Sequence, residues 1–170
     1  TFKSKTYHIN KTNLCNDKNI RLIHIFEDDW LFKKDIVKSR LTSIFGKSEK
    51  IYARKCSISE ISQAICNKFL NDNHIQGTVN SKYRYGLYYN NELVAVMTFG
   101  VSRFKKSEHE LLRYCSKLNT TVVGGASKLF KYHINKENLT EIISYADRCW
   151  SNGNLYTSIG FEFDSFTEPS

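Results

Sequence analysis

The sequence predicts a mixed α/β (α+β) fold, with a mixed central sheet and flanking helices. Apolar periodicity between residues 51 and 166 gives the element order strand, helix, hairpin, strand, helix, strand, helix, strand. The hairpin is the clearest of these elements, because Asn90-Asn91 separates two strand-like runs as a type I′ turn does. The 170 residues are enough for one domain with a proper core and a short extra element.

Residues 1–46 are expected to form a short helix-strand-helix segment. Residues 5–18 predict a helix, and residues 20–26 alternate like a strand rich in β-branched side chains. Residues 28–46 predict a second helix that ends at Gly46. Its apolar positions are Trp30, Ile36, Val37, Leu41, Ile44 and Phe45. The segment is too small to bury a core alone, so we expect it to dock on residues 47–170 or to end a larger unit.

Residues 47–170 carry the α/β elements in order. Residues 51–56 predict a strand, and residues 57–74 a helix that opens on a capping box of Ser57 and Glu60. One face of that helix is marked by Ile61, Ile65, Phe69 and Leu70. The hairpin over residues 83–100 and a strand over 109–118 follow. The last predicted elements are a helix over 126–134, a strand over 141–147, a short helix over 154–159 and a strand over 160–166.

Composition limits the compartment and the partner. The formal net charge of +8, with aromatic residues among the Lys and Arg, favours a polyanionic partner; the alternative is simply a solvated basic surface. Five scattered cysteines indicate a reducing compartment and no structural zinc. Without a long apolar run or a secretory signal, we expect no membrane partner and a cytoplasmic location in a bacterial or phage-infected cell. The chain does not start with Met, so we expect a fragment or a processed product.

The second part resembles the GNAT acyltransferase fold over about residues 51–166. The matching pieces are the hairpin, a V-x-GGAS loop that opens a helix, and NLYTSIGFEF, which looks like the LYxxxGF signature. The resemblance implies an acetyl-coenzyme A site built from Val123, Gly124, Gly125, Ala126 and Ser127. Two glycines let the backbone approach closely, and N–H groups at a helix start attract a pyrophosphate. Thr121 stands where the family has Arg or Gln, so a glycine turn without a ligand stays open as the alternative.

Further stretches are similar to the Mom-type branch of this fold, which modifies adenine in phage DNA. They are ELLRYCSKL, GGASKL and ISYADRCWSNGNLYTSIGF. The resemblance implies catalytic roles for Asp147, Tyr156, Ser127 and His74. A carboxylate such as Asp147 can accept the proton of an attacking amine, and a phenol such as Tyr156 can protonate a leaving thiolate. The alternatives are a capping role for Asp147 and a core position for Tyr156.

Residues 7–41 resemble the closing segment of phage-type homing endonucleases related to the very-short-patch-repair nuclease. The nuclease metal site of that family lies upstream of Thr1, so a divalent metal is expected only with that missing core. We read the acidic run Glu27, Asp28 and Asp29 as a helix N-terminus rather than a metal site. These resemblances favour a DNA-binding GNAT-like module of a homing endonuclease. The alternative is an acyl-coenzyme A-dependent N-acyltransferase acting on DNA adenine or another amine.

Double-stranded DNA is accordingly the expected partner. The expected phosphate contacts are Arg103, Lys105, Lys106, Lys128, Lys131 and Arg148. Arg148 and Trp150, in the loop after Asp147, are expected to stack on a flipped base; the alternative is a half-buried Trp150.

Overall fold

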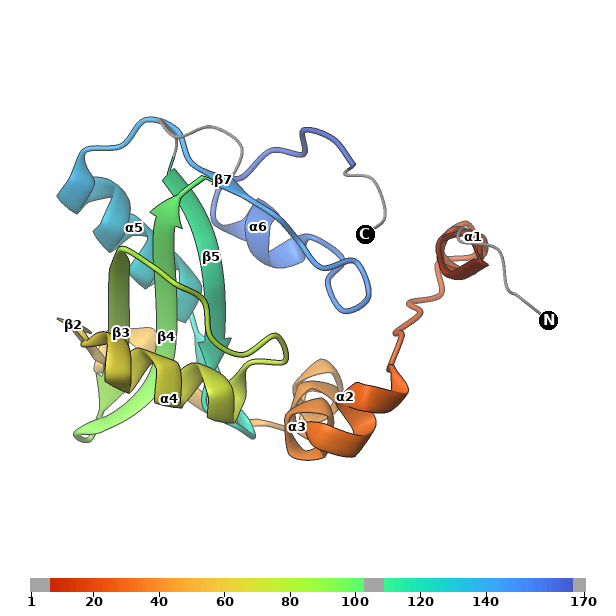
Figure 1. The fold of residues 1–170 in the computed structure, drawn as a ribbon, viewed down its shortest axis with the longest axis horizontal. Coiled ribbons are helices and arrows are strands. Elements are labelled where there is room, and N and C mark those ends of the chain that lie inside the picture. Colours follow the sequence, from red (N-terminus) through yellow and green to blue (C-terminus); the bar gives the residue numbers. More distant parts are fainter. Residues whose placement is uncertain (1–6, 103–108, 167–170) are drawn as a thin grey trace.

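The structure, a computed structural model, describes residues 7–102 and 109–166. Its main sheet has five strands in the order β2-β3-β4-β5-β7. These strands are β2 (Ser57–Glu60), β3 (Tyr83–Tyr89), β4 (Glu92–Val101), β5 (His109–Ser116) and β7 (Ile143–Ser144). Neighbouring strands are antiparallel except β5 and β7, which run parallel. The predicted mixed sheet with flanking helices is confirmed (Figure 1).

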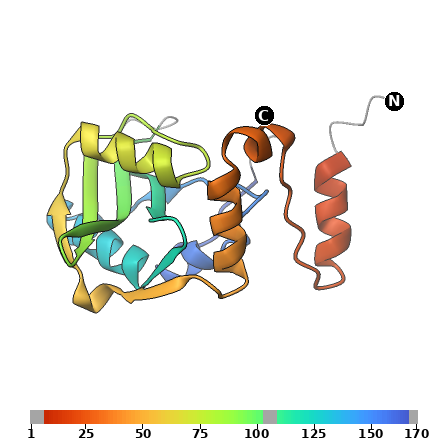
Figure 2. The same cartoon turned by 90° about the horizontal axis from the view of Figure 1, so that it is seen from below.

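Helices cover both faces of this sheet. Helix α4 (Gln63–Asn73) lies on one face, and α5 (Gly125–Glu137) and α6 (Asn154–Ser158) lie on the other (Figures 1 and 2). The α5 face buries the larger core, formed by Tyr85, Leu87, Met97, Phe99, Leu111 and Leu129 among others. The α4 face buries Cys66, Phe69, Leu70, Val96 and Cys115. Among the described residues, no helix is long and apolar enough to cross a membrane.

The predicted hairpin turn is confirmed by its backbone angles. Asn90 and Asn91 have φ values of 50° and 64°, and the two strands pair from Tyr89 and Glu92 outwards. A type I′ turn needs positive φ at both central residues, and Asn tolerates that conformation better than most residues do.

The start of α4 differs from the predicted capping box. Ser57 and Glu60 lie in β2, which pairs with β3, and the N-cap is Ser62, whose hydroxyl accepts the Ile65 N–H at 3.3 Å. Cross-strand pairing outweighed the local cap pattern. Ile65 of the predicted apolar face is 47% exposed, whereas Phe69 and Leu70 are buried as expected.

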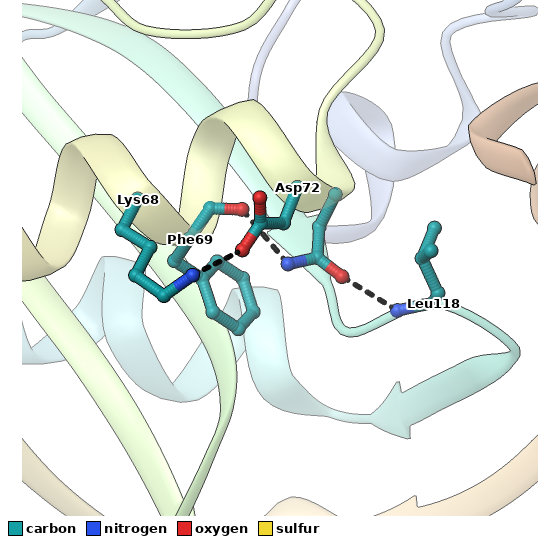
Figure 3. Close-up of polar contacts among 5 residues, drawn as sticks. Lys68, Phe69, Asp72 and Leu118 are labelled. Carbon is teal, nitrogen blue, oxygen red and sulfur yellow. Dashed lines mark hydrogen bonds and ion pairs between the residues drawn. The ribbon is translucent and has the colours of Figure 1, made fainter. Parts of the chain in front are cut away.

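The end of α4 is tied to the turn that follows β5. The Asn73 side chain donates to the Phe69 carbonyl at 2.8 Å and accepts the Leu118 N–H at 2.7 Å (Figure 3). The neighbouring ion pair of Lys68 and Asp72 lies on the exposed side of the helix (Figure 3). Asn73 therefore fixes α4 against the β5 end of the sheet.

The N-terminal segment is helical but has no strand. Its helices are α1 (Tyr7–Asn16), α2 (Glu27–Phe32) and α3 (Lys34–Ile44), so the predicted second helix is broken at Lys33. The predicted strand over residues 20–26 is irregular chain, because no sheet edge lies beside it. Ile36 and Val37 of α3 pack with Ile75 and Trp150 of the second part, whereas Trp30 is 41% and Phe45 70% exposed.

A second, two-stranded sheet lies beside the main one. Strand β1 (Glu49–Tyr52) runs parallel to β6 (Thr120–Val123) and leads into a 3-10 turn, η1 (Ala53–Lys55). The prediction of a strand over residues 51–56 is therefore correct only for Ile51 and Tyr52.

The end of the chain carries less strand than expected. The predicted strand over 141–147 is reduced to the two residues of β7, and residues 160–166 form no strand. Gly160 has φ 98° just after α6, and no neighbouring strand offers the following residues a pairing edge.

Candidate functional site

The sheet opens between β5 and β7. The two strands pair only at Glu110 with Ile143 and at Leu111 with Ser144, where the Ser144 hydroxyl also donates to the Leu111 carbonyl at 2.9 Å. Strand β5 continues to Ser116 against β4, while the chain after Ser144 turns away (Figure 1). Within the described sheet, the outer edge of residues 112–116 is therefore not covered by a strand. We call this opening the β5/β7 split.

The double glycine lies beside the C-terminal half of β5, where the Val122 N–H donates to the Ser116 hydroxyl at 3.4 Å. Strand β6 ends at Val123, Gly124 adopts φ 75°, and α5 begins at Gly125. A Cβ at Gly125 would lie 2.7 Å from the Tyr114 hydroxyl and 2.9 Å from Val122 Cγ1, so only glycine fits between the helix and the strands. The N–H groups of the first turn have no partner within the helix. This is the backbone geometry that the resemblance implied.

One of those N–H groups is already used. Burial raises the pKa of Tyr114 to about 12, while hydrogen bonds with the Ser116 side chain and the Ala126 backbone act in the opposite direction. The Ala126 N–H therefore binds the phenol oxygen of β5, and Ser127 lies half-buried in the same first turn. An anion at this terminus would meet the neighbouring N–H groups rather than that of Ala126.

The turn η1 is held beside the double glycine by Lys128. The Lys128 ammonium donates to the Ala53 carbonyl at 2.9 Å and to the Cys56 carbonyl at 2.5 Å. The Cβ position of Gly124 lies 3.8 Å from Ala53 Cβ, and the exposed Arg54 and Lys55 follow Ala53 in the same turn, with the Arg54 guanidinium 5.4 Å from the Tyr52 ring centroid. Lys128, expected on DNA, thus makes internal contacts.

Thr121, at the position of the family's Arg or Gln, serves the structure. Its hydroxyl lies 2.6 Å from the Ser48 oxygen and 3.1 Å from the Ser43 oxygen, and it links α3 and β1 to β6. It therefore points towards the N-terminal part rather than towards a ligand at the glycine loop.

Asp147 organises the loop that follows β7. Its carboxylate accepts the Cys149 N–H at 2.9 Å and the Gln76 side-chain amide at 3.5 Å, and its carbonyl accepts the Ser151 N–H at 2.8 Å. These bonds hold a turn over residues 147–151; the alternative interpretation expected Asp147 to cap a helix, but in the described chain no helix follows it before α6. The contact with Gln76 also places Asp147 on the α4 side of the β5/β7 split.

His74 lies on the same side, at the C-terminal end of α4. Its Nδ1 accepts the Gln76 N–H at 3.1 Å, and its ring is 9% exposed. Burial lowers the pKa of His74 to about 3, and the positive charges of Arg113, Arg40 and Lys33 add to this effect. The ring is therefore neutral near pH 7 and too weak a base to accept the proton of an amine.

The loop carrying Asp147 is closed by the N-terminal part. Trp150 is 4% exposed, with the Arg40 guanidinium 4.7 Å from its ring centroid and its carbonyl accepting from Arg21 at 3.2 Å. Burial lowers the pKa of Arg40, and the Asp147 carboxylate opposes that shift. The Trp150 ring has no open face for a base. Arg148 and Lys131 are exposed, and Arg103, Lys105 and Lys106 lie outside the described residues.

Tyr156 lies on α6, on the face opposite to His74 and Asp147. Its half-buried ring packs against the α5-face core and meets Phe161 edge-on at 5.7 Å. No hydrogen bond among the described residues joins it to Asp147, which lies on the α4 side, so the structure does not bring these two predicted catalytic groups together.

Two residues of this site, Glu110 and Arg40, are assigned no functional role from the sequence. Glu110 is 2% exposed and lies in β5 at the last pairs before the split. It belongs to the ELLR motif, which predicts the strand but does not mark Glu110 as a functional carboxylate. Arg40 comes from α3, and only the tertiary contact with Trp150 shows its place beside Asp147.

A divalent metal has no visible site in the described part of the chain. No group of three or more His, Cys, Asp or Glu side chains there could hold a metal ion. Glu27, Asp28 and Asp29 occupy the first turn of α2, where carboxylates interact favourably with the helix dipole.

Comparison with known proteins supports the fold class. No protein-family model and no curated protein matches the sequence. Among solved structures, the chain is similar to an aminoglycoside acetyltransferase from an uncultured soil metagenomic sample, in complex with trehalose. The TM-score is 0.51 at 12% identity, over 68% of this chain and 93% of that one. The fold is thus that of the GNAT-type acetyltransferases, and the comparison lends no support to an endonuclease module.

Proposed function

We propose that this protein is an N-acyltransferase that transfers an acyl group from acyl-coenzyme A to an amine. The observation that carries the proposal is the combination of the β5/β7 split with a helix that begins at two glycines beside the uncovered half of β5. An extended donor can lie along the uncovered edge of β5 with its pyrophosphate at the start of α5. The GNAT-type fold supports this reading over the DNA-binding endonuclease module.

The residues at the glycine loop fit a pyrophosphate. Gly124 and Gly125 leave room for close approach, and the free first-turn N–H groups and the helix dipole favour an anion. Arg54 and Lys55 supply the positive charge that Thr121 does not. Bound acyl-coenzyme A would supply an activated thioester at the β5/β7 split.

The chain's own side chains can handle the protons of acyl transfer. Two carboxylates border the split on the α4 side, Glu110 on β5 and Asp147 after β7, and either can take a proton from the attacking amine. Tyr156 on the opposite face can give a proton to the leaving thiolate. His74, held neutral by its surroundings, does not take part as a base.

The acceptor named for the structural neighbour, an aminoglycoside, does not suit this chain. Aminoglycosides carry several amines that are protonated at neutral pH. The guanidinium groups of Arg40 and Arg113 lie on the α4 side of the split, near His74. Burial is the main cause of the lowered pKa of His74, and these two positive charges lower that pKa further. Like charges so close together disfavour a polycationic acceptor.

Calorimetric titration with acetyl-coenzyme A tests the proposal. We predict binding that weakens at least about tenfold in Ser127→Glu, because a carboxylate in the first turn of α5 repels the pyrophosphate. The same carboxylate interacts favourably with the dipole of α5, so the variant should stay folded. Ser127→Gln, of similar size but uncharged, is the matched control and should bind nearly like the parent protein.

Two results would refute the proposal. One is a parent protein that shows no saturable heat with acetyl-coenzyme A, and the other is equal affinity for the Glu and Gln variants, which would remove the start of α5 from the donor site.

A further inference from the structure

An open cavity lies on the α4 face, across the sheet from the proposed donor site. It has a volume of about 520 Å³ and is lined by residues 79–82, Gly100, Val101, Leu112 and Arg113. Leu112 and Arg113 belong to the part of β5 whose outer edge the split leaves uncovered. The cavity therefore reaches the strand edge at which the donor thioester is expected.

Polar side chains cross the sheet behind this cavity in one row. Arg84 of β3 pairs with Thr98 of β4, and Thr98 pairs with Arg113 of β5. Directly paired residues share a face of the sheet, and Arg113 lines the cavity, so all three belong to its side. Nearer the start of β5, Glu110 pairs with Gly100, which also lines the cavity. A row of this kind is unusual on a face that elsewhere buries an apolar core.

Several polar atoms here are buried without a partner among the described residues. They are the hydroxyl oxygens of Ser81 and Thr98 and the Nε of Arg84. Ser81 is 7% and Thr98 0% exposed. Buried donors of this kind cost free energy unless something hydrogen-bonds them. The Ser81 side chain belongs to the cavity lining, so a polar ligand there could satisfy it.

Positive charge dominates this side of the sheet. Arg113 lines the cavity and Arg84 lies next to it, where its guanidinium donates to the Ser81 carbonyl and to Gln63 at 3.1 Å. Lys82 also lines the cavity, at an exposed position, and its ammonium lies 5.0 Å from the centroid of the Tyr83 ring. Arg40 lies farther along, over Trp150. The buried carboxylate of Glu110 is the nearest negative group of the row.

We propose that the cavity binds the acceptor and that the acceptor is a small primary amine that carries an anionic group, a carboxylate or a phosphate. Arg113 holds the anionic group, the exposed Lys82 adds positive charge at the rim of the cavity, and the amine faces the β5/β7 split beside Glu110. This inference rests on the proposed acyl transfer. In that step the ammonium group loses one proton to the carboxylate, the C–N bond forms as the thioester C–S bond breaks, and the second amine proton ends on the released thiol.

Matched acceptor pairs test the inference with the full chain and acetyl-coenzyme A. Thiol release is measured with O-phosphoethanolamine against ethanolamine and with glycine against glycinamide. We expect the anionic member of at least one pair to have a kcat/KM at least about tenfold higher, since a guanidinium or ammonium pairs strongly with an anion. The pair that shows the preference tells a phosphate acceptor from a carboxylate acceptor.

Charge-removing variants locate the preference. Lys82→Gln, at an exposed lining position, should reduce the preference several-fold, and Arg113→Met should abolish it. Lys68→Gln, on the exposed side of α4, is the control and should leave it unchanged (Figure 3). If Arg113→Met does not fold, the loss of acceptor preference in Lys82→Gln alone decides whether the cavity binds the anionic group.

The outcomes separate this inference from the proposed function. Acetyl-coenzyme A binding with equal or better turnover of the neutral amines overturns the inference and leaves the acyltransferase proposal standing. Preferential acetylation of a duplex oligonucleotide overturns it as well. A chain that does not bind acetyl-coenzyme A overturns both.

Discussion

At the scale of single residues, the chemistry assigned to Tyr156 can be separated from donor binding. We predict that Tyr156→Phe lowers kcat by about 10²-fold or more, because proton transfer by a positioned side chain contributes that much, and leaves the affinity for acetyl-coenzyme A unchanged. Tyr132→Phe, on the outer side of α5, is the matched control. Equal turnover in both variants would show that the phenol of Tyr156 only fills the core, where its ring packs against Phe161.

His133 shows how burial couples one residue to pH. Its ring is 0% exposed and stacks on Phe99 at 3.7 Å, with the Tyr85 hydroxyl 3.2 Å from Nδ1 and His109 3.4 Å from Nε2. Burial lowers the pKa of His133 to about 4, with smaller effects from His109 and Lys136 and an opposing one from Glu137. In the unfolded chain the His133 ring therefore becomes protonated below about pH 6.5, whereas in the folded chain it becomes protonated only below about pH 4.

The predicted consequence is a loss of stability as the pH falls from 6.5 to 4. His133 should contribute about 1.4 kcal/mol per pH unit to the free energy of unfolding in this window, and His74, with its pKa also lowered, adds a similar slope. Urea unfolding at several pH values measures it. His133→Gln should remove about half of this slope. An unchanged slope in His133→Gln would contradict the buried neutral ring.

At the scale of elements, the start of α4 allows a matched test of two serines. Ser62 caps the helix through the Ile65 N–H, whereas Ser57 lies exposed in β2. We predict that Ser62→Ala lowers the free energy of unfolding by about 1 kcal/mol, as the loss of an N-cap does. Ser57→Ala should change it by less than about 0.5 kcal/mol. Urea unfolding of both variants measures the difference, and a larger loss at Ser57 would restore the capping box that the sequence suggested.

The elements that the sequence predicts well are those fixed by local backbone demands. Asn90-Asn91 and Gly124-Gly125 place residues that tolerate positive φ where the chain must turn, and both predictions are confirmed. The elements that it predicts poorly depend on distant partners. Residues 20–26 and 160–166 have strand-like patterns but pair with no strand, whereas Ser57–Glu60 forms a strand by pairing with β3.

At the scale of the whole molecule, the sheet separates two chemical environments and the β5/β7 split joins them. The glycine loop and Tyr156 belong to the α5 and α6 side, while His74, Asp147 and the cationic cavity belong to the α4 side. The motif residues could be found from sequence because they are close together along the chain. Arg40, Glu110 and the row from Arg84 to Arg113 could not, because only the register of strands and the docking of α3 bring them to the site.

The central claim is that an acyl donor lies along the uncovered edge of β5 with its pyrophosphate at the start of α5. The most direct measurement is a titration of the ¹⁵N-labelled protein with acetyl-coenzyme A, followed by backbone amide chemical shifts. We predict saturable shifts at Gly124, Gly125 and Ser127 and along residues 112–116, with little change in α1. No shifts at saturating donor, or shifts confined to residues away from β5 and the glycine loop, would contradict the claim.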